Sequence, residues 1–260
     1  MKAKKVKKMR LLSLEIILFY FYFICLGGCM STGATNKDFA DLHFRVGSSH
    51  LEKANFPEAL KELLQAESYN TNDPLIYNNL GLAYFMLERY EQSEFNFRKA
   101  ITLDSTFTDA RNNLSRVLIE RGKYKEAREQ IKLVLEDLTY TQPAKVFINL
   151  GLSYFREHKY ADSKEAFLKA VSYDRENCLA QSYYGRSLLE MKDSERAIQV
   201  LDKASGICLK VNFDEPIYFS AIAYYRMGDR IKAQARLETL VQKNSPFKDK
   251  AESMLDILRK

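Results

Sequence analysis

Few residues of this sequence have the type and spacing needed for catalysis or for metal binding. The chain has three histidines, His43, His50 and His158. His43 and His50 are seven residues apart on one predicted helix and could share a face, but neither a cysteine nor a third histidine completes a metal set. The sequence also lacks a glycine-rich phosphate loop, a Gly-x-Ser-x-Gly elbow and a His-Glu-x-x-His motif. We therefore expect no enzyme, no bound metal, no cofactor and no small-molecule substrate.

Two of the four cysteines, Cys25 and Cys29, lie in an N-terminal segment typical of exported proteins. Residues 1–10 are basic, residues 11–26 are almost wholly apolar, and Gly27-Gly28 precede Cys29. This order predicts a secretory signal, and the apolar run is shorter than the roughly 20 residues that span a bilayer. An uncleaved signal anchor, or an ordinary secreted protein cleaved elsewhere, remains the alternative.

The stretch Leu26-Gly27-Gly28-Cys29 resembles a bacterial lipobox. The resemblance implies a signal peptide over residues 1–28, a fatty-acylated Cys29, and a flexible tether over residues 29–39. The residue after the cysteine is not aspartate, which in enteric lipoproteins favours the outer membrane. The expected location is therefore the outer membrane, with the lipid-anchored chain facing the periplasm.

The formal charge of +6 does not indicate nucleic-acid binding. Six basic residues and one acidic residue fall within the first 28 positions, so the remainder carries a net charge of only +1. A nearly neutral remainder offers no surplus of cations to neutralise phosphates. We expect no nucleic-acid partner.

From residue 40 onward the chain repeats with a period of 34 residues. A small residue at the eighth place, such as Gly81 or Gly151, is followed twelve places later by another, such as Ser93 or Ser163. Six such units are present: 40–73, 74–107, 108–141, 144–177, 178–211 and 214–247, with two-residue insertions after 141 and 211. Residues 248–260 have apolar residues at helical spacing and predict a capping helix.

This pattern is similar to that of the tetratricopeptide repeat, in which each unit is a pair of antiparallel helices. The resemblance implies an all-α, right-handed superhelix over residues 40–260, with a concave inner face. It also implies which places in the first helix of each unit face that groove. These places hold Asn78, Asn79, Leu82, Phe85, Met86, Asn112, Asn113, Arg116, Ile148, Asn149, Leu152 and Phe155.

The composition of this groove suggests binding of an extended protein segment. Asn79, Asn113 and Asn149 occupy one equivalent place in three successive units, and an amide can both donate to and accept from a peptide backbone. Leucine and phenylalanine side chains beside them would supply apolar pockets. Two alternatives stay open: the asparagines tie adjacent helices together, or the convex face binds the partner.

The remaining cysteines, Cys178 and Cys208, lie in the fifth unit. Cys178 opens its first helix and Cys208 follows the end of its second, so an antiparallel hairpin brings them side by side. An exported compartment permits oxidation. A disulfide and two buried free thiols are both consistent with the sequence.

A lipobox, a short tether and six such repeats resemble the type IV pilus biogenesis lipoproteins, the pilotins. The most similar stretch is residues 140–177, YTQPAKVFINLGLSYFREHKYADSKEAFLKAVSYDREN, which includes an insertion before the fourth unit. The resemblance implies a protein partner, a secretin subunit, whose localisation and multimerisation the chain would assist. A general envelope scaffold for peptidoglycan or outer-membrane assembly machinery is the alternative, and periplasmic carbohydrate binding a more distant one.

Overall fold

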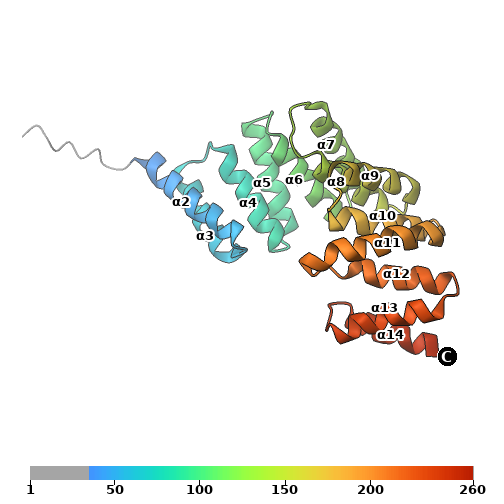
Figure 1. Cartoon of the computed structure of the whole chain (residues 1–260). Coiled ribbons are helices and arrows are strands. Elements are labelled where there is room, and N and C mark those ends of the chain that lie inside the picture. Colours follow the sequence, from blue (N-terminus) through green and yellow to red (C-terminus); the bar gives the residue numbers. More distant parts are fainter. Residues whose placement is uncertain (1–34, 260) are drawn as a thin grey trace, which may run out of the picture.

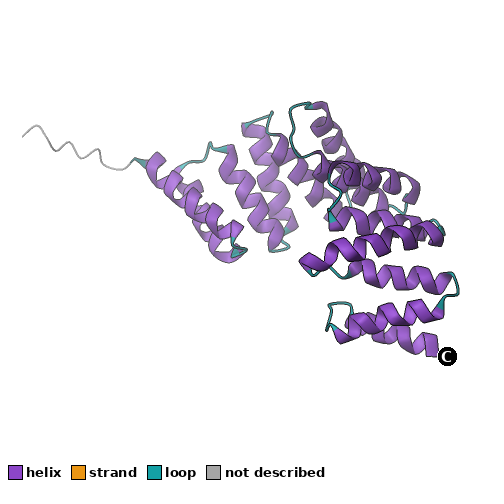
Figure 2. Ribbon diagram, in the orientation of Figure 1, coloured by secondary structure: helices purple, strands orange, loops and turns teal. Residues whose placement is uncertain are grey.

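The computed structural model describes residues 35–259, and in this range the chain forms helices and connecting turns without strands. The helices follow one another as antiparallel hairpins along an arc, from α2 to α14 (Figures 1 and 2). They are α2 (Asn36–Glu52), α3 (Phe56–Tyr69), α4 (Pro74–Met86), α5 (Tyr90–Leu103), α6 (Thr108–Glu120), α7 (Tyr124–Glu136), α8 (Pro143–Arg156), α9 (Tyr160–Tyr173), α10 (Cys178–Glu190), α11 (Ser194–Cys208), α12 (Glu215–Arg226), α13 (Arg230–Gln242) and α14 (Lys248–Arg259). The predicted all-α superhelix of six repeats and a capping helix is confirmed.

Close packing inside each hairpin explains the small residues of the repeat. A Cβ atom on Gly81 would lie 2.6 Å from Cε1 of Phe97, a separation that real Cβ atoms do not show. The matching contact in the fourth repeat places a Cβ on Gly151 2.8 Å from the Phe167 ring. Only glycine lets the two helices approach this closely, and a larger residue would overpack the buried ring.

The small residue of the second helix completes the same contact. Ser93 Oγ donates to the carbonyl of Gly81 at 2.7 Å, and Ser163 Oγ donates to the carbonyl of Gly151 at 3.1 Å. Both hydroxyls are buried. Each is therefore satisfied within its hairpin, as buried polar groups must be.

The turn inside each hairpin contains one residue in the left-handed region. Gly122 and Gly228 have φ of 73° and 81°, and Glu88 and His158 reach 59° and 60° in the corresponding turns. The turns at Gly122 and Gly228 therefore place glycine where the backbone requires it. In the other turns a residue with a side chain accepts this conformation.

The first helix begins before the predicted start of the repeat domain at residue 40. Thr35 caps α2 and forms a capping box with Asp38, which starts the helix at Asn36. Reciprocal bonds of this kind satisfy the free N–H groups of a helix start. The predicted signal peptide, the lipidated Cys29 and the tether up to residue 34 lie outside the described residues.

The connections between hairpins differ in length. Residues 70–73, 104–107 and 174–177 each link two hairpins with four residues, whereas 137–142 uses six. Between α11 and α12 the chain adds a short 3-10 helix, Leu209–Val211. At the C-terminal end, α14 covers the last repeat by burying Ala251, Leu255 and Leu258.

Among the described residues, every helix is too short or too polar to cross a lipid bilayer.

Candidate partner-binding face

The predicted groove residues divide into a buried set and an accessible set. Within the accessible set, Leu82, Phe85 and Phe155 are half-buried and Met86 is 49% exposed. The buried set consists of Asn78, Asn112, Ile148, Asn149 and Leu152. These five pack between neighbouring helices and leave little surface for a partner, so the accessible groove is narrower than the sequence predicted.

The asparagine row joins the first helices of successive repeats. Asn79 Nδ2 on α4 donates to Ser48 Oγ on α2 at 2.8 Å. Asn113 Nδ2 on α6 donates to Asn78 Oδ1 on α4 at 3.0 Å. We call this set of contacts the asparagine ladder.

The ladder ends at α8. Asn149 Nδ2 lies within hydrogen-bond distance of Asn112 Oδ1 (2.9 Å), the Asn112 carbonyl (3.1 Å) and Ser115 Oγ (3.2 Å). The geometry corresponds to the alternative in which the amides tie adjacent helices. It does not leave the Nδ2 group of Asn149 free to donate to a peptide backbone, because this buried group already has partners.

The accessible part of the groove over α4, α6 and α8 combines apolar and charged side chains. Phe85 packs against Tyr90 with ring centroids 5.7 Å apart, and the Arg116 guanidinium lies 5.9 Å from the Phe85 ring. Arg116 and Arg156 both pair with Glu120, at 3.1 and 3.6 Å. Apolar rings beside anchored arginines are typical of the centre of protein interfaces.

Arginine and aromatic side chains form a second part of the inner face over α10 and α12. The Arg186 guanidinium carbon lies 4.2 Å from the Phe219 ring centroid, 4.3 Å from Tyr183 and 4.9 Å from Phe155. Its Nη1 donates to Glu215 Oε1 at 2.8 Å. We call these residues the Arg186 cluster.

The prediction missed this cluster because the groove positions were read only for the second, third and fourth units. The same positions in the fifth and sixth units give Tyr183, Arg186 and Phe219. The signal was therefore present in the sequence.

The structure joins Cys178 and Cys208 in a disulfide, with their Cα atoms 5.5 Å apart. The bond links the start of α10 to the end of α11 and closes the hairpin of the fifth repeat. Cys208 is fully buried, whereas Cys178 is half-buried.

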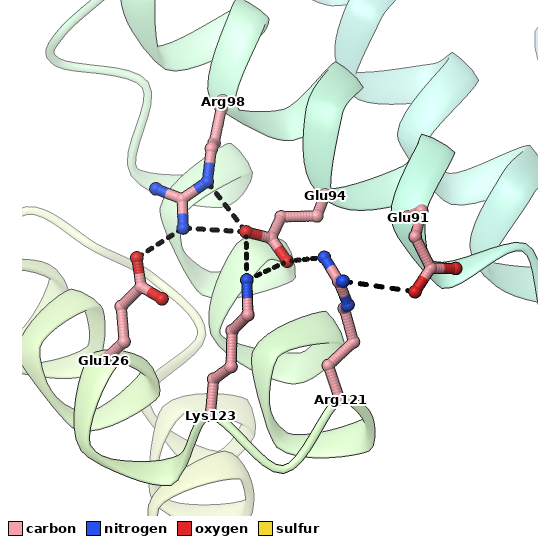
Figure 3. Close-up of polar contacts among 6 residues, drawn as sticks. All are labelled: Glu91, Glu94, Arg98, Arg121, Lys123 and Glu126. Atoms are coloured by element: carbon pink, nitrogen blue, oxygen red, sulfur yellow. Dashed lines mark hydrogen bonds and ion pairs between the residues drawn. The ribbon is translucent and has the colours of Figure 1, made fainter.

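An ion-pair network connects the second and third repeats near their turns (Figure 3). The buried Glu94 carboxylate on α5 accepts from Arg98, from Arg121 and from Lys123, the last at 3.0 Å. Arg98 also pairs with Glu126, and Arg121 with Glu91. Burial alone would raise the pKa of Glu94, but the hydrogen bonds from Lys123, Arg98 and Arg121 outweigh it and lower the pKa.

The three histidines do not converge. His43 Nδ1 contacts Glu62 Oε2 at 2.7 Å, His50 lies 3.5 Å from Asn55 Nδ2, and His158 contacts the Tyr160 hydroxyl at 2.7 Å. Within residues 35–259, three or more metal-ligating side chains are nowhere gathered in one place.

Models of the tetratricopeptide repeat match residues 74–107, 108–137 and 148–207, and a TPR repeat model matches residues 47–88. Together they extend over more than half of the chain and coincide with the helical hairpins. The chain belongs to the tetratricopeptide-repeat proteins, a class that binds protein partners.

Among individual relatives, the type IV pilus assembly protein PilF of Pseudomonas aeruginosa is 25% identical over 172 residues, which are 63% of this chain and 68% of PilF. The solved structure of PilF is similar with a TM-score of 0.67 and 20% identity, over 80% of this chain and 92% of that one. The structure of PilW, described as a widely conserved type IV pilus biogenesis factor, reaches a TM-score of 0.76 at 14% identity, over 83% and 98% of the two chains. The chain is thus similar in sequence to PilF, and the two solved structures share its fold.

The expectation that this chain is not an enzyme is contradicted by these comparisons. Protein O-mannosyl-transferase TMTC3 of Homo sapiens is 26% identical over 230 residues, which are 81% of this chain. The chain spans only about a quarter of that transferase, 24% of its length. Repeats of this kind therefore occur within proteins named as enzymes, and neither the fold nor the lack of a familiar motif excludes catalysis, because a fold does not determine a function.

Proposed function

We propose that this protein is an outer-membrane lipoprotein that binds a secretin subunit and assists its localisation and multimerisation in type IV pilus biogenesis. In this proposal Cys29 carries the lipid, and the repeats face the periplasm. The single observation that supports the proposal most is the sequence similarity to PilF, whose name describes it as a pilus assembly protein.

The accessible inner face supplies the proposed binding surface. Phe85, Met86 and Phe155 offer apolar area, and Arg116 offers a cation that is held in place by Glu120. An extended or helical segment of the partner would cover the apolar side chains and pair with the arginine. Burial of these rings provides affinity, and the anchored charge provides register.

The lipid anchor has a second role in this proposal. A partner bound to a membrane-tethered chain meets its neighbours at a high effective concentration, which favours multimer formation without any chemical step. An N-terminus that carries several acyl chains holds the complex at the membrane much more stably than a single chain.

The test uses a strain that lacks the gene and measures secretin multimers that resist heat and detergent. We expect the multimers to disappear and to return with the intact gene. The Cys29→Ser variant should restore them only in part, because the folded protein would be mislocalised.

Met86→Asp probes the groove in the same strain. Met86 is 49% exposed, so this change should leave the fold intact while it weakens partner binding. Ile231→Asp serves as the matched surface control for the groove, because Ile231 is 83% exposed and lies on α13, the second helix of its repeat. Multimers that persist unchanged in the deletion strain would overturn the proposal and leave the general envelope scaffold as the function to test.

A further inference from the structure

Two apolar residues of α3 and α5 are exposed at places where most other repeats have polar side chains. Phe95 on α5 is 66% exposed, and Leu64 on α3 is 41% exposed. At the place of Phe95 the other five repeats carry Lys61, Glu129, Glu165, Gln199 and Ala235. At the place of Leu64 four of the other five carry charged residues, namely Arg98, Lys132, Asp202 and Glu238. The fold therefore does not require an apolar side chain at either place.

A third residue, Glu67 on α3, is charged at a place where most other repeats are apolar. The equivalent residues of the other repeats are Ile101, Leu135, Val171, Ser205 and Val241. Glu67 is half-buried, and no ion pair among residues 35–259 includes it. The neighbouring Tyr77 phenol does not neutralise it, since burial and, after it, the Glu67 carboxylate raise the pKa of Tyr77. Burial of a carboxylate without a cation is unfavourable, so the fold alone does not account for Glu67.

These three residues line one cavity of about 370 Å³. Leu64 and Glu67 come from α3, Phe95 comes from α5, and α4 contributes the half-buried ring of Tyr84. None of the residues predicted to face the inner groove is part of this lining. We call this site the α3–α5 cavity.

The charged groups that line the α3–α5 cavity are all negative. They are the carboxylates of Glu67 and Glu91, and the lining contains no lysine, arginine or histidine. Glu91 pairs with Arg121 at 3.1 Å, but 73% of its side chain remains exposed. Lys99 lies outside the lining, with its ammonium 5.8 Å from the Tyr77 ring centroid. An incoming group therefore meets two carboxylates and no cation, which favours a positively charged partner.

We propose that the α3–α5 cavity binds a segment of a partner protein that presents a large apolar side chain next to a lysine or arginine. The apolar side chain packs between Leu64 and Phe95 and against the ring of Tyr84. The neighbouring cation pairs with Glu67, which then has the partner that the repeats themselves do not provide. This interaction surface is separate from the inner face and does not depend on the proposed pilus function.

The chemistry of the lining indicates a protein segment and not a metal ion. Two carboxylates are too few to hold a hard cation, which takes six or more oxygen ligands. Among the described residues, three or more metal-ligating side chains are not gathered in this cavity or elsewhere. The apolar walls instead have room for one large side chain. Anchor side chains of this kind, held in a pocket, contribute most of the binding energy of many protein interfaces.

The test selects random peptides, displayed on phage, on the purified chain. Peptides that also bind the Phe95→Gln variant are removed, and this variant carries the residue that the fifth repeat has at the same place. We expect the remaining peptides to share a large apolar residue within two positions of lysine or arginine. Fluorescence anisotropy should show that synthetic versions bind Glu67→Ile about tenfold more weakly than the natural chain, because the charge pair is lost.

An exchange of charge tests the ion pair directly. Glu67→Lys should weaken the binding of these peptides more than Glu67→Ile does, because it replaces attraction by repulsion. Peptides in which the lysine or arginine is replaced by glutamate should bind Glu67→Lys more tightly than they bind the natural chain. A loss of apolar area alone would not reverse the preference in this way.

The matched control makes the same substitution at the same place of another repeat. Leu64 lines the cavity, whereas Leu168 on α9, which is 42% exposed, does not. Leu64→Arg should therefore lower the affinity, and Leu168→Arg should leave it unchanged. Circular dichroism should be the same for every variant, because none of the replaced side chains is buried.

Several results would overturn the proposal. They are the absence of any peptide that survives the removal step, surviving peptides that carry acidic instead of basic residues, and equal losses of affinity for Leu64→Arg and Leu168→Arg. Self-association of the natural chain in sedimentation that Phe95→Gln abolishes would also overturn it, because the occupant would then be a second copy of this chain.

Discussion

The inner face of the superhelix is built differently in its two halves. The sixth residue of the repeat is asparagine in the second, third and fourth repeats, where Asn79, Asn113 and Asn149 donate hydrogen bonds to the preceding repeat. The same position holds Tyr183 in the fifth repeat and Phe219 in the sixth, where the rings contact Phe155 and Arg186. One structural position thus connects neighbouring repeats by hydrogen bonds in one half and by aromatic contacts in the other.

This difference shows that the repeat fixes the helices but not the means by which they are joined. Each repeat contacts only its neighbours, so each junction can be stabilised independently. Hydrogen bonds between amides demand a fixed distance and direction. Aromatic contacts tolerate changes in angle, and they present a larger surface to a partner.

The largest expected effect concerns the disulfide of the C-terminal half. Replacement of Cys178 and Cys208 by serine should lower the free energy of unfolding by about 3–4 kcal/mol, because the bond closes a loop with a sequence separation of 30 residues. Urea denaturation with and without reductant measures this. Reductant should destabilise the natural protein and leave the double variant unchanged. Two free thiols in the denatured, unreduced protein would contradict the disulfide.

Loss of one amide tests the asparagine ladder. Asn149→Ala should lower the free energy of unfolding by about 2–3 kcal/mol, because it leaves the buried Asn112 side chain without its donor. Asn113→Ala is the comparison and should lower the free energy of unfolding less, by about 1–2 kcal/mol, because Asn113 is half-buried and donates a single bond, to the buried Asn78 Oδ1. Equal losses in chemical denaturation would mean that burial does not distinguish the two positions.

Substitutions in the Arg186 cluster should lower the free energy of unfolding less than the loss of the Asn149 amide does. Arg186→Lys keeps a positive charge for Glu215 but removes the flat guanidinium that lies against three rings. It should lower the free energy of unfolding by about 1 kcal/mol. Arg186→Met, which removes the charge, should lower the free energy of unfolding more, because Glu215 then loses its ion-pair partner and keeps only the Ser182 hydroxyl. A larger loss for lysine than for methionine would show that the charge contributes little.

The smallest expected change is a loss of stability at the junction between the second and third repeats, and it should appear only in acid. The pKa of Glu94 is lower in the folded chain than its ordinary value of 4.5, so its contribution to stability is present above that value and is lost as the pH falls through the folded pKa. The protection factors of α5 and α7 against hydrogen exchange should therefore fall below about pH 4.5. Glu94→Gln should remove this dependence, and an unchanged profile would assign it to other carboxylates.

Features that recur within one hairpin could be predicted from the sequence. The glycine and serine of each repeat, such as Gly81 and Ser93, mark a contact that depends only on the local period. The pairing of Cys178 with Cys208 was foreseen for the same reason, although free thiols were an equal alternative.

Features that arise between repeats could be predicted only in part, because the sequence left open whether the asparagines tie adjacent helices or bind a peptide. The direction of the Asn149 amide depends on how α8 sits against α6, and this geometry is not encoded in either helix alone. The Glu94 network joins residues from two repeats at positions outside the repeat consensus.

The place where the asparagine ladder ends divides the molecule into two parts whose repeats are joined in different ways. In the N-terminal part, asparagine amides join the inner edges of four successive first helices, α2, α4, α6 and α8. Beyond α8 the equivalent places hold aromatic rings, and α10 is joined to α12 by the bonds that Arg186 and Ser182 donate to Glu215. The disulfide closes the fifth hairpin in the same half, so the two halves are held together by different kinds of bond.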